Sequence, residues 1–473
     1  MEEVLLNRSL TLEENPQLDG IANEASGSSA PTRVVLLSIF VAASGSFAYG
    51  CASGFSSPAE SGIMTDLGLS TADYSLFGSA LTIGGMLGAA VSGKIADLIG
   101  RRGAMWFLQI FFITGWLSII FAKGAWSLDI GRLSLGIGAG MNCYVANVYI
   151  AEITPKRIRG GCTVFNQLSI CYGISLMFFV GNVVTWRVLA VIGTAPSLVQ
   201  VIGLFFIPES PRWLAKIGKV KEFEATLQRL RGAKCDISQE AAEIRDYTEA
   251  LRLLPQSRIL DLFHRKYAHA LIVGVGLMLL VQLGGNGGIA FYASSIFEAG
   301  GSSASVGTTA MAIIQIPCSI LGVYLMDKCG RRTLLMVTAA VTCLGAFLAG
   351  LAFLLQDFDQ PKELSAALIL SGILVYAAGF STGVGGTPFV IMSEIFPINI
   401  KGSAGSLANL TNWFGSWVVS YSYNFLFEWS SAGVFFMYTI VSGLIVVFVA
   451  ILVPETKGRT LEEIQASMID LFH

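Results

Sequence analysis

The stretch Gly93-Lys94-Ile95-Ala96-Asp97-Leu98-Ile99-Gly100-Arg101-Arg102 stands between two long apolar runs. A shorter version, Leu325-Met326-Asp327-Lys328-Cys329-Gly330-Arg331-Arg332, stands between two apolar runs in the second half of the chain. Each version joins a carboxylate, a glycine and two arginines in a short loop. The two versions lie about half the chain apart, since Asp97 of the first corresponds to Asp327 of the second. A motif that recurs in this way indicates an internal duplication.

Two further motifs repeat in the same order and at nearly the same interval. Ala151-Glu152-Ile153-Thr154-Pro155 recurs as Ser393-Glu394-Ile395-Phe396-Pro397. Pro208-Glu209-Ser210-Pro211-Arg212 recurs as Pro454-Glu455-Thr456-Lys457-Gly458-Arg459. A parallel repeat of two membrane-embedded halves is typical of transporters that hold their substrate between the halves, near the middle of the bilayer.

The composition excludes several classes of protein. The chain has 473 residues, of which 53% are hydrophobic and 13% charged, and its net charge is −2. A soluble domain is about 25% charged, so an ordinary soluble enzyme and a disordered chain are both excluded. Because no basic tract could follow a phosphate backbone, we expect no binding to nucleic acid. The eight cysteines lie mostly in apolar segments and are interpreted as small core residues.

Twelve apolar runs are about long enough to cross a bilayer as helices. Lipid offers no hydrogen-bond partners to the backbone, so the expected fold class is an all-α membrane protein. The runs lie near 34–55, 74–93, 104–122, 128–150, 164–184, 187–207, 269–292, 307–326, 333–355, 366–391, 404–427 and 432–453. The predicted organisation is a disordered cytoplasmic tail (1–32), a six-helix bundle (33–207), a cytoplasmic helical loop (208–268), a second six-helix bundle (269–453) and a cytoplasmic tail (454–473). Glycines and Pro388 make the run near 366–391 easy to bend.

Lys and Arg are unevenly distributed between the two sets of loops. If the N-terminus is cytoplasmic, the loops on the opposite side hold only Lys123, Arg187 and Lys362. Since basic loops stay in the cytoplasm, both termini are predicted to be cytoplasmic. The first 32 residues lack a basic start followed by an apolar core, so we expect no cleaved signal peptide.

The sequence carries no enzyme motif. It contains no phosphate-binding GxxxxGK[ST] loop, no GxSxG turn and no His/Cys set with metal-ligand spacing. We therefore expect no enzymatic activity, no cofactor and no metal.

The repeated motifs GKIADLIGRR, PESPRWL, MDKCGRR and PETKGRT resemble those of the sugar porter family of the major facilitator superfamily. They occur in both halves, so the resemblance covers nearly the whole chain. The stretch after the seventh run and the short N-terminal tail are most similar to the plant early-responsive-to-dehydration group of monosaccharide transporters. The resemblance implies a major facilitator fold of twelve helices in two bundles, and a hexose such as glucose or fructose as substrate.

Polar side chains inside membrane helices are costly and often mark a functional site. A sugar needs neutral hydrogen-bonding groups for its hydroxyls and an aromatic ring for its apolar face. On that ground we predict a sugar site built from amides and one indole ring, with hydrogen bonding between helices as the alternative role of each. The candidates are Gln167, Gln282, Asn286, Gln315, Asn412 and Trp413.

The family resemblance supports the same residues. Phe165-Asn166-Gln167-Leu168 resembles the motif of the fifth span, whose Gln contacts sugar, and Asn412-Trp413 resembles the pair in the eleventh span, whose ring covers the sugar. The stretch from Val281 to Gly287 resembles the motif Gln-Gln-x-Ser-Gly-x-Asn, with the first Gln, the Ser and the last Asn replaced by Val, Gly and Gly. These departures predict weaker binding or a changed sugar preference. Tyr292 resembles an aromatic residue of the outer gate.

The charged residues of the repeated motifs all fall at the predicted cytoplasmic ends of the spans. Carboxylates and arginines together can pair where the halves meet, and such pairs would separate when the cytoplasmic side opens. The alternative is that the basic residues serve membrane topology alone. The predicted gate comprises Asp97, Arg101, Arg102, Glu152, Arg159, Glu209, Arg212, Asp327, Arg331, Arg332, Glu394, Glu455 and Arg459, with Tyr292 on the outer side.

The first span indicates passive transport. Proton-coupled members of the family carry Phe-Gly-Tyr-Asp there, and the Asp partners an Arg in the fourth span. This chain reads Phe47-Ala48-Tyr49-Gly50 and keeps Arg132, which stays charged and cannot carry the proton. We therefore predict facilitated diffusion; a proton symporter or antiporter using Asp129 or another carboxylate is the alternative, and a non-transporting sugar sensor the third. Asp129, three residues before Arg132, is expected to form a structural ion pair with it.

The target membrane is predicted to be vacuolar or plasma membrane. Leu5-Leu6 beside Glu2-Glu3 resembles an acidic dileucine sorting signal. The expected partners are a small sugar and the lipid bilayer. No motif specifies the individual sugar or an oligomeric state.

Overall fold

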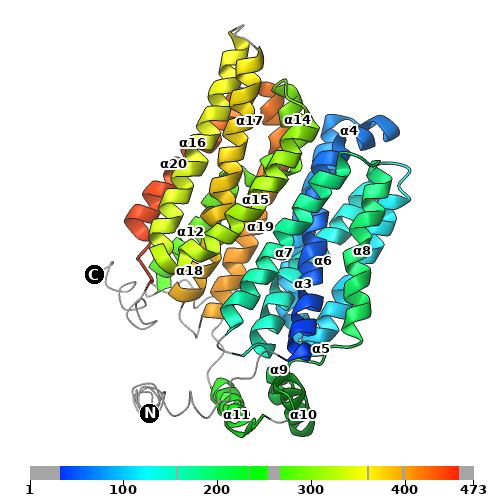
Figure 1. Ribbon diagram of the computed structural model, residues 1–473, viewed down its shortest axis with the longest axis vertical. Helices are drawn as coiled ribbons and strands as arrows, with labels where there is room; N and C mark the ends of the chain where they lie inside the picture. Colours follow the sequence, from blue (N-terminus) through cyan, green and yellow to red (C-terminus); the bar gives the residue numbers. More distant parts are fainter. Residues whose placement is uncertain are drawn as a thin grey trace.

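A computed structural model describes residues 32–155, 158–233, 235–253, 267–358, 362–396 and 400–457. Their regular structure is helical, which confirms the predicted all-α fold class. Two groups of long helices stand side by side, and the end of the molecule that carries α9, α10 and α11 is called the lower end here (Figure 1). Residues 1–31 of the predicted N-terminal tail, which include the dileucine pair, and Arg459 lie outside the described residues.

The first bundle consists of five long helices and a shorter one at the upper end. The bounds are α3 (Arg33–Gly54), α4 (Ser56–Leu67), α5 (Thr71–Ile120), α6 (Ala125–Ile153), α7 (Arg159–Gly181) and α8 (Trp186–Leu204). Short apolar-faced helices follow at the lower end, with Leu214, Phe223 and Leu227 buried between them. These are α9 (Pro211–Lys216), α10 (Val220–Arg231) and α11 (Ser238–Leu253).

Helix α5 contains two of the predicted spans. Gly100 interrupts it with φ 84°, a left-handed conformation that favours glycine. Positions on both sides of this break face neighbouring parts of α6, because a Cβ at Gly136 would meet Leu81 and one at Gly138 would meet Phe112. The chain therefore turns back at Gly100, where the sequence predicts a loop.

The second bundle contains more interrupted helices than the first. Its bounds are α12 (Ala268–Leu283), α13 (Asn286–Phe291), α14 (Ala293–Ala299), α15 (Ala304–Cys329), α16 (Arg331–Asp357), α17 (Lys362–Gly379), η4 (Phe380–Val384), α18 (Thr387–Ile395), α19 (Lys401–Trp429) and α20 (Ser431–Leu452). The π-helical η4 and the glycines after it interrupt the regular α-helix of the tenth span, where the composition predicts easy bending. The predicted seventh span is divided at Gly285, with φ 99°, and ends at the boundary of α13 and α14.

The described helices account for the twelve predicted spans. Eight of them are long and apolar enough to cross a membrane by length and composition, and α5 does so twice because it reverses at Gly100. Helices α6, α7 and α19 complete the set. Many large apolar side chains, such as Phe40, Ile110 and Ile451, are more than half exposed, as expected for a surface in contact with lipid.

Glycines allow α5 and α6 to pack closely together. A Cβ at Gly84 would lie 2.2 Å from the carbonyl oxygen of Leu133, and one at Gly140 would lie 2.1 Å from that of Gly85. Small residues let the backbones of membrane helices approach closely, so that van der Waals packing can hold the helices together.

We predict that Gly140→Ala destabilises the protein by about 1–3 kcal/mol, because the methyl group would press on backbone that cannot rotate away. The measurement is the thermal unfolding midpoint of the purified protein in detergent. The matched control is Gly405→Ala on α19, where a Cβ meets nothing within 4 Å. That variant should be neutral or slightly more stable, and equal losses in both variants would contradict the packing argument.

Candidate functional site

A cavity of about 110 Å³ lies between the two bundles, and every residue that lines it is uncharged. The first bundle contributes α3, α5 and α7, and the second contributes α12, α13 and α19. The lining residues are Tyr49, Ser53, Leu81, Thr82, Ile170, Ile174, Gln282, Asn286, Gly287, Ala290, Phe291, Asn412, Trp413 and Ser416. Four of the six predicted sugar-binding residues are among them.

The amide groups of the cavity gather at the break between α12 and α13. Gln282 lies in the last turn of α12, and its Nε2 donates a hydrogen bond of 2.7 Å to Asn412 Oδ1 on α19. Asn286 begins α13 directly after the left-handed Gly285. A Cβ at that glycine would lie 2.4 Å from the ring of Tyr438. The interruption thus brings two amides of one span to the same cavity.

Trp413 joins the two bundles at the cavity. Its side chain is only 5% exposed, and its ring centroid lies 6.0 Å from that of Tyr49 on α3. A Cβ at Gly85 of α5 would lie 2.4 Å from the Trp413 ring, so the indole fits only because this residue is glycine.

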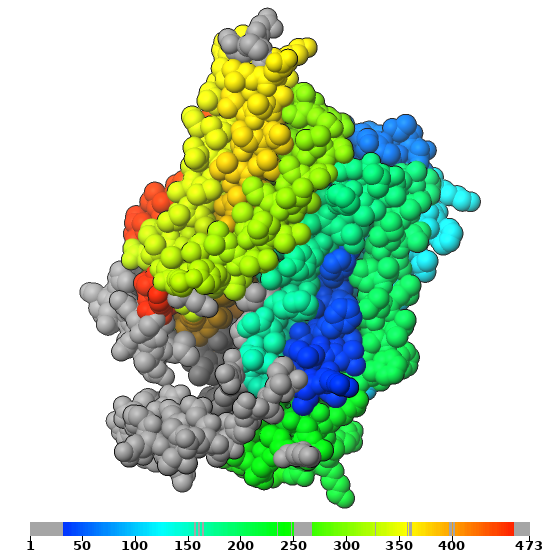
Figure 2. Space-filling model, in the orientation of Figure 1, coloured from blue at the N-terminus to red at the C-terminus, as the bar shows by residue number. Residues whose placement is uncertain are grey.

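Gln167 and Gln315 do not line the described cavity. Gln167 is exposed on α7, one helical turn below the lining residue Ile170. Gln315 lies on α15, where its carbonyl accepts a hydrogen bond from Ser319. Ser319 also contacts Cys171 of α7, along the contact between the bundles that Figure 2 displays.

Hydrogen bonds fasten the bundles together at the upper end. Asn424 Nδ2 of α19 donates to Ser75 Oγ of α5 at 3.0 Å, and Asn182 after α7 donates to Thr308 Oγ1 of α15 at 3.1 Å. Tyr292, the predicted outer-gate residue, is fully buried there and stacks on Tyr423 with centroids 5.0 Å apart. The upper end is closed in this structure.

Three ion pairs between described residues of the repeated motifs each join two residues of the same bundle. In the first bundle, Arg101 donates to both carboxylate oxygens of Glu152 at 2.9 and 3.0 Å and to Asp97 at 3.2 Å. In the second bundle, Arg331 pairs with Glu394 at 3.2 Å. Pairing between the bundles stays a prediction. Arg212 lies at the start of α9, while the side chains of Arg159 and Asp327 are outside the described part of the chain.

The second arginine of each pair has an equivalent partner in the two halves. Arg102 donates through Nε to the carbonyl oxygen of Leu204 near the end of the sixth span, at 2.8 Å. Arg332 donates to the carbonyl oxygen of Ala450 near the end of the twelfth span, at 2.5 Å. The duplicated motifs therefore build the same contact twice.

A glutamate caps the helix that restarts after each motif glycine. Glu209 accepts hydrogen bonds from the backbone amides of Arg101 and Arg102 at 2.9 and 3.0 Å. Glu455 accepts from the amide of Arg331 at 3.0 Å, after Gly330 with φ 85°. A carboxylate at a helix N-terminus satisfies unpaired amides and is favoured by the helix dipole.

The two capping carboxylates differ in their electrostatics. Burial raises the pKa of the Glu209 carboxyl even though backbone amides donate to it. At Glu455 burial also opposes ionisation, but the amides of Lys457, Arg331 and Thr456 outweigh it and lower the pKa. The Glu455 carboxyl is therefore the more acidic of the two.

Arg132 corrects one expectation from the sequence. It is fully buried, and instead of pairing with Asp129 it donates to the carbonyl oxygen of Ala52 and to Ser56 Oγ. Its guanidinium also lies 5.1 Å from the Phe77 ring and 5.9 Å from the Phe291 ring. The side chain points into the bundle toward α3 and α4, so the three-residue spacing to Asp129 brings no contact.

Sequence reasoning missed the hydroxyl groups of the cavity. Tyr49, Ser53, Thr82 and Ser416 line it. Ser, Thr and Tyr are so frequent in the spans that their presence carried no signal. Other polar residues of the first bundle form hydrogen bonds between its helices: Gln109 donates to Gln200, and Asn142 donates to Ser46 at 3.0 Å.

Comparisons with known proteins agree with this geometry. Residues 34–468 match the model of the family "Sugar (and other) transporter". "Sugar transporter ERD6-like 7" of Arabidopsis thaliana is 52% identical over 92% of this chain and 94% of that protein. "Sugar transporter ERD6-like 16" of the same plant is also 52% identical, over 92% of this chain and 90% of that protein.

Solved structures share the fold. The proton:xylose symporter XylE bound to 6-bromo-6-deoxy-D-glucose is similar with a TM-score of 0.75 and 25% identity, over 93% of this chain and all (100%) of that one. The inward open conformation of the xylose transporter XylE from E. coli gives a TM-score of 0.77 and 24% identity, over 92% and 99% of the two chains. These likenesses identify a major facilitator fold.

The chain therefore belongs to the sugar transporter family and, within it, to the ERD6-like type. It is an integral membrane protein that transports sugar and is not an enzyme; its partners are a sugar and membrane lipid.

We predict that Glu209→Ala destabilises the protein by about 1–2 kcal/mol, because the amides after Gly100 lose their cap. The control is Glu222→Ala, which removes an exposed carboxylate paired with Lys219 and should change stability by less than about 0.5 kcal/mol. Thermal unfolding in detergent measures both, and an unchanged midpoint for Glu209→Ala would refute the capping role.

Proposed function

We propose that this protein carries a monosaccharide by alternating access and without coupling to protons. The observation that carries the proposal is the uncharged cavity between the bundles, with an amide pair and an indole ring in its wall. A sugar has hydroxyls that donate and accept hydrogen bonds, together with an apolar ring face. The cavity offers a partner for each of these features.

The amide pair suits a site that must bind and release its ligand. In this structure Gln282 donates to Asn412, so neither of these two groups is left wholly without a partner. A sugar hydroxyl can replace one of them while the Trp413 ring covers its apolar face. We include Gln167 and Gln315 in the site as residues that approach the sugar when the lower end closes. Gln167 lies on α7, which lines the cavity, and Gln315 lies on α15, which contacts α7.

Two rigid halves, 33–207 and 269–453, are proposed to move against each other. The inter-bundle hydrogen bonds at the upper end support a state in which the sugar leaves downward. At the lower ends, Arg101 pairs with Glu152 in the first bundle and Arg331 with Glu394 in the second. When the lower end closes, the two sets approach one another and can form the interbundle gate. This switch needs only a small difference in contact energy between the two states.

Three local features support passive transport. A Cβ at Gly50 would lie 2.2 Å from the carbonyl oxygen of Ile170, so a carboxylate at this position has no room without movement of α3 or α7. Arg132 is bonded to a carbonyl and a hydroxyl instead of a carboxylate. The lining of the central cavity contains no Asp, Glu or His among the described residues.

We propose that the lower end faces the cytoplasm and that both termini lie there. The arginine-rich repeated motifs gather at this end, in agreement with the distribution of charges between the loops. The vacuolar membrane or the plasma membrane is the proposed location.

We predict that Gln282→Ala raises the half-saturation concentration for sugar about tenfold, because one or two neutral hydrogen bonds are lost. The double variant Gln167→Ala with Gln282→Ala should abolish saturable uptake while the protein still reaches the membrane. The measurement is uptake into proteoliposomes with a panel of hexoses and pentoses. The control is Gln356→Ala, whose amide bonds to Ala299 at the upper end; unchanged kinetics in the double variant would remove both residues from the site.

We predict that sugar counterflow in proteoliposomes is equally fast with and without a protonophore, because no titratable group of the described lining carries a proton through the cycle. Addition of sugar should cause no uptake of protons, measured with an entrapped pH dye. Proton entry that depends on sugar would instead favour a symporter.

A further inference from the structure

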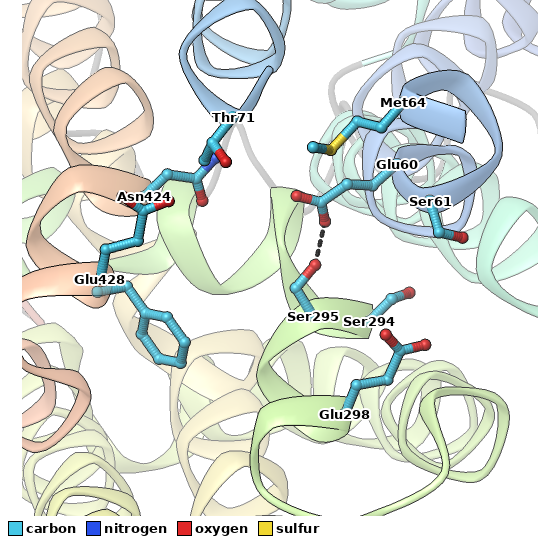
Figure 3. A pocket seen from close by; sticks show the side chains of 10 residues that line it. Glu60, Ser61, Met64, Thr71, Ser294, Ser295, Glu298, Asn424 and Glu428 are labelled. Carbon is cyan, nitrogen blue, oxygen red and sulfur yellow. Dashed lines mark hydrogen bonds between the residues drawn. The ribbon is translucent and has the colours of Figure 1, made fainter. Parts of the chain in front are cut away.

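A second cavity, of about 280 Å³, lies between the bundles at the upper end. Figure 3 shows residues of α4 and α5 from the first bundle facing residues of α14 and α19 from the second. It contains three carboxylates, Glu60, Glu298 and Glu428, and no Lys or Arg among its described lining residues. Its chemistry differs from that of the uncharged central cavity.

Glu60 differs from the other two carboxylates because it is buried in the contact between the bundles. Its side chain is only 8% exposed, whereas Glu298 and Glu428 are exposed. Ser295 Oγ of α14 donates a hydrogen bond to Glu60 Oε2 of α4, which Figure 3 marks with a dashed line. This bond can exist only while the upper end is closed.

A second contact beside Glu60 connects the same two helices. The backbone amide of Ser294 donates to Ser57 Oγ at 2.8 Å, and the two hydroxyls lie 2.9 Å apart. Ser57 lies three residues, about one helical turn, before Glu60 on α4. Together the two contacts form a clasp, defined here as Ser57 and Glu60 of the first bundle with Ser294 and Ser295 of the second.

The surroundings of Glu60 disfavour its charged form. Burial raises the pKa of this carboxyl to about 7; the Ser295 hydrogen bond lowers it in part, and the negative charge of Glu298 raises it further. Two arginines bond to α4: Arg132 to Ser56, four residues before Glu60, and Arg187 to Asp66, six residues after it. The titratable and charged groups around Glu60 on the packed helices are Glu298, Glu428, Tyr74, Tyr292, Tyr423 and Arg132.

We propose that Glu60 is the residue through which protons on the upper side control transport: protonated Glu60 keeps the clasp closed, and its ionisation favours opening. This inference rests on the proposed alternating access. In the open state Glu60 is hydrated, and its pKa returns toward the ordinary value of 4.5. The closed state therefore binds the proton more tightly than the open state does. The resulting stabilisation of the closed state is complete below about pH 4.5 and is lost as pH rises through about 7.

Protons reach Glu60 from the upper side and leave to the same side. Between the two cavities lies a layer of buried rings, in which Tyr74 and Tyr292 are 0% exposed, Tyr423 is 1% exposed and Phe291 is 6% exposed. Tyr292 stacks on Tyr423 in this layer. Proton binding therefore controls the rate of the cycle without moving protons across the membrane, which is compatible with passive sugar transport.

The test measures how often the upper end opens. Ala290, in the wall of the central cavity, is changed to cysteine (Ala290→Cys) and labelled from the upper side of sealed vesicles with a membrane-impermeant maleimide between pH 5 and 7.5. The same reporter in a Glu60→Gln background corrects for the intrinsic pH dependence of thiol labelling, and the chain without the reporter corrects for native cysteines. Glu428→Gln is the matched control, because it removes an exposed carboxylate from the same cavity.

With Glu60 present, labelling should rise about fiftyfold more between pH 5 and 7.5 than it does with Glu60→Gln. The Glu428→Gln protein should behave like the parent. A second variant, Ser295→Ala, keeps the carboxyl and removes its partner, so it should label several-fold faster at pH 5. Identical pH profiles with Glu60 and Glu60→Gln, or sugar-driven proton uptake that Glu60→Gln abolishes, would overturn the proposal.

Sugar counterflow in the same vesicles separates this proposal from the proposed function. If counterflow is active and the pH profile of labelling is the same with Glu60 and with Glu60→Gln, the proton control alone is refuted. A Glu60-dependent labelling profile without counterflow of any tested monosaccharide supports the proton control of opening and refutes the monosaccharide assignment.

Discussion

In a membrane, a backbone group that leaves its helix must find a partner inside the protein, because lipid offers none. A backbone group buried at the end of a span has the same need, because the protein around it excludes water. After Gly100 and Gly330 the restarting helices meet the carboxylates of Glu209 and Glu455. At Gly285 the interrupted seventh span opens into the cavity that holds Gln282 and other amides. Breaks in the helices are therefore the places where structural caps and the candidate sugar site occur.

The fold could be predicted from the sequence because the repeated motifs indicate two similar halves. In the structure, equivalent residues of the two motifs make equivalent contacts. The Arg–Glu pair joins Arg101 to Glu152 in one half and Arg331 to Glu394 in the other. Hydropathy located the spans, since each must be apolar to contact lipid. The motifs did not show whether these charges pair within or between the halves. Pairing between the halves depends on the angle between the bundles. That angle differs between the conformations of a carrier, and the sequence is the same in all of them.

The candidate site was predictable only in part, for reasons of chemistry. Gln282 and Asn412 stood out because amides are costly in lipid, and they do share the cavity. Hydroxyls such as that of Thr82 are cheap enough to occur throughout the spans, so they carried no signal. The expected pairing of Asp129 with Arg132 was wrong, because the fold turns the arginine toward α3 and α4. Glu60 lies between two predicted spans, where a carboxylate is unremarkable until the second bundle buries it.

The two cavities divide the work of a carrier between neutral and ionisable groups. A charge in the central cavity would have to lose its water in each cycle, and a neutral sugar offers it no opposite charge in return. A carboxylate at the upper contact loses its water only when the bundles meet, so its desolvation cost falls on one conformation alone. That difference is what allows Glu60 to bias the equilibrium between states. Sugar affinity can then remain independent of pH while the frequency of opening responds to it, because the recognising amides and the titrating carboxyl are separated by the buried layer of Tyr292 and Tyr423.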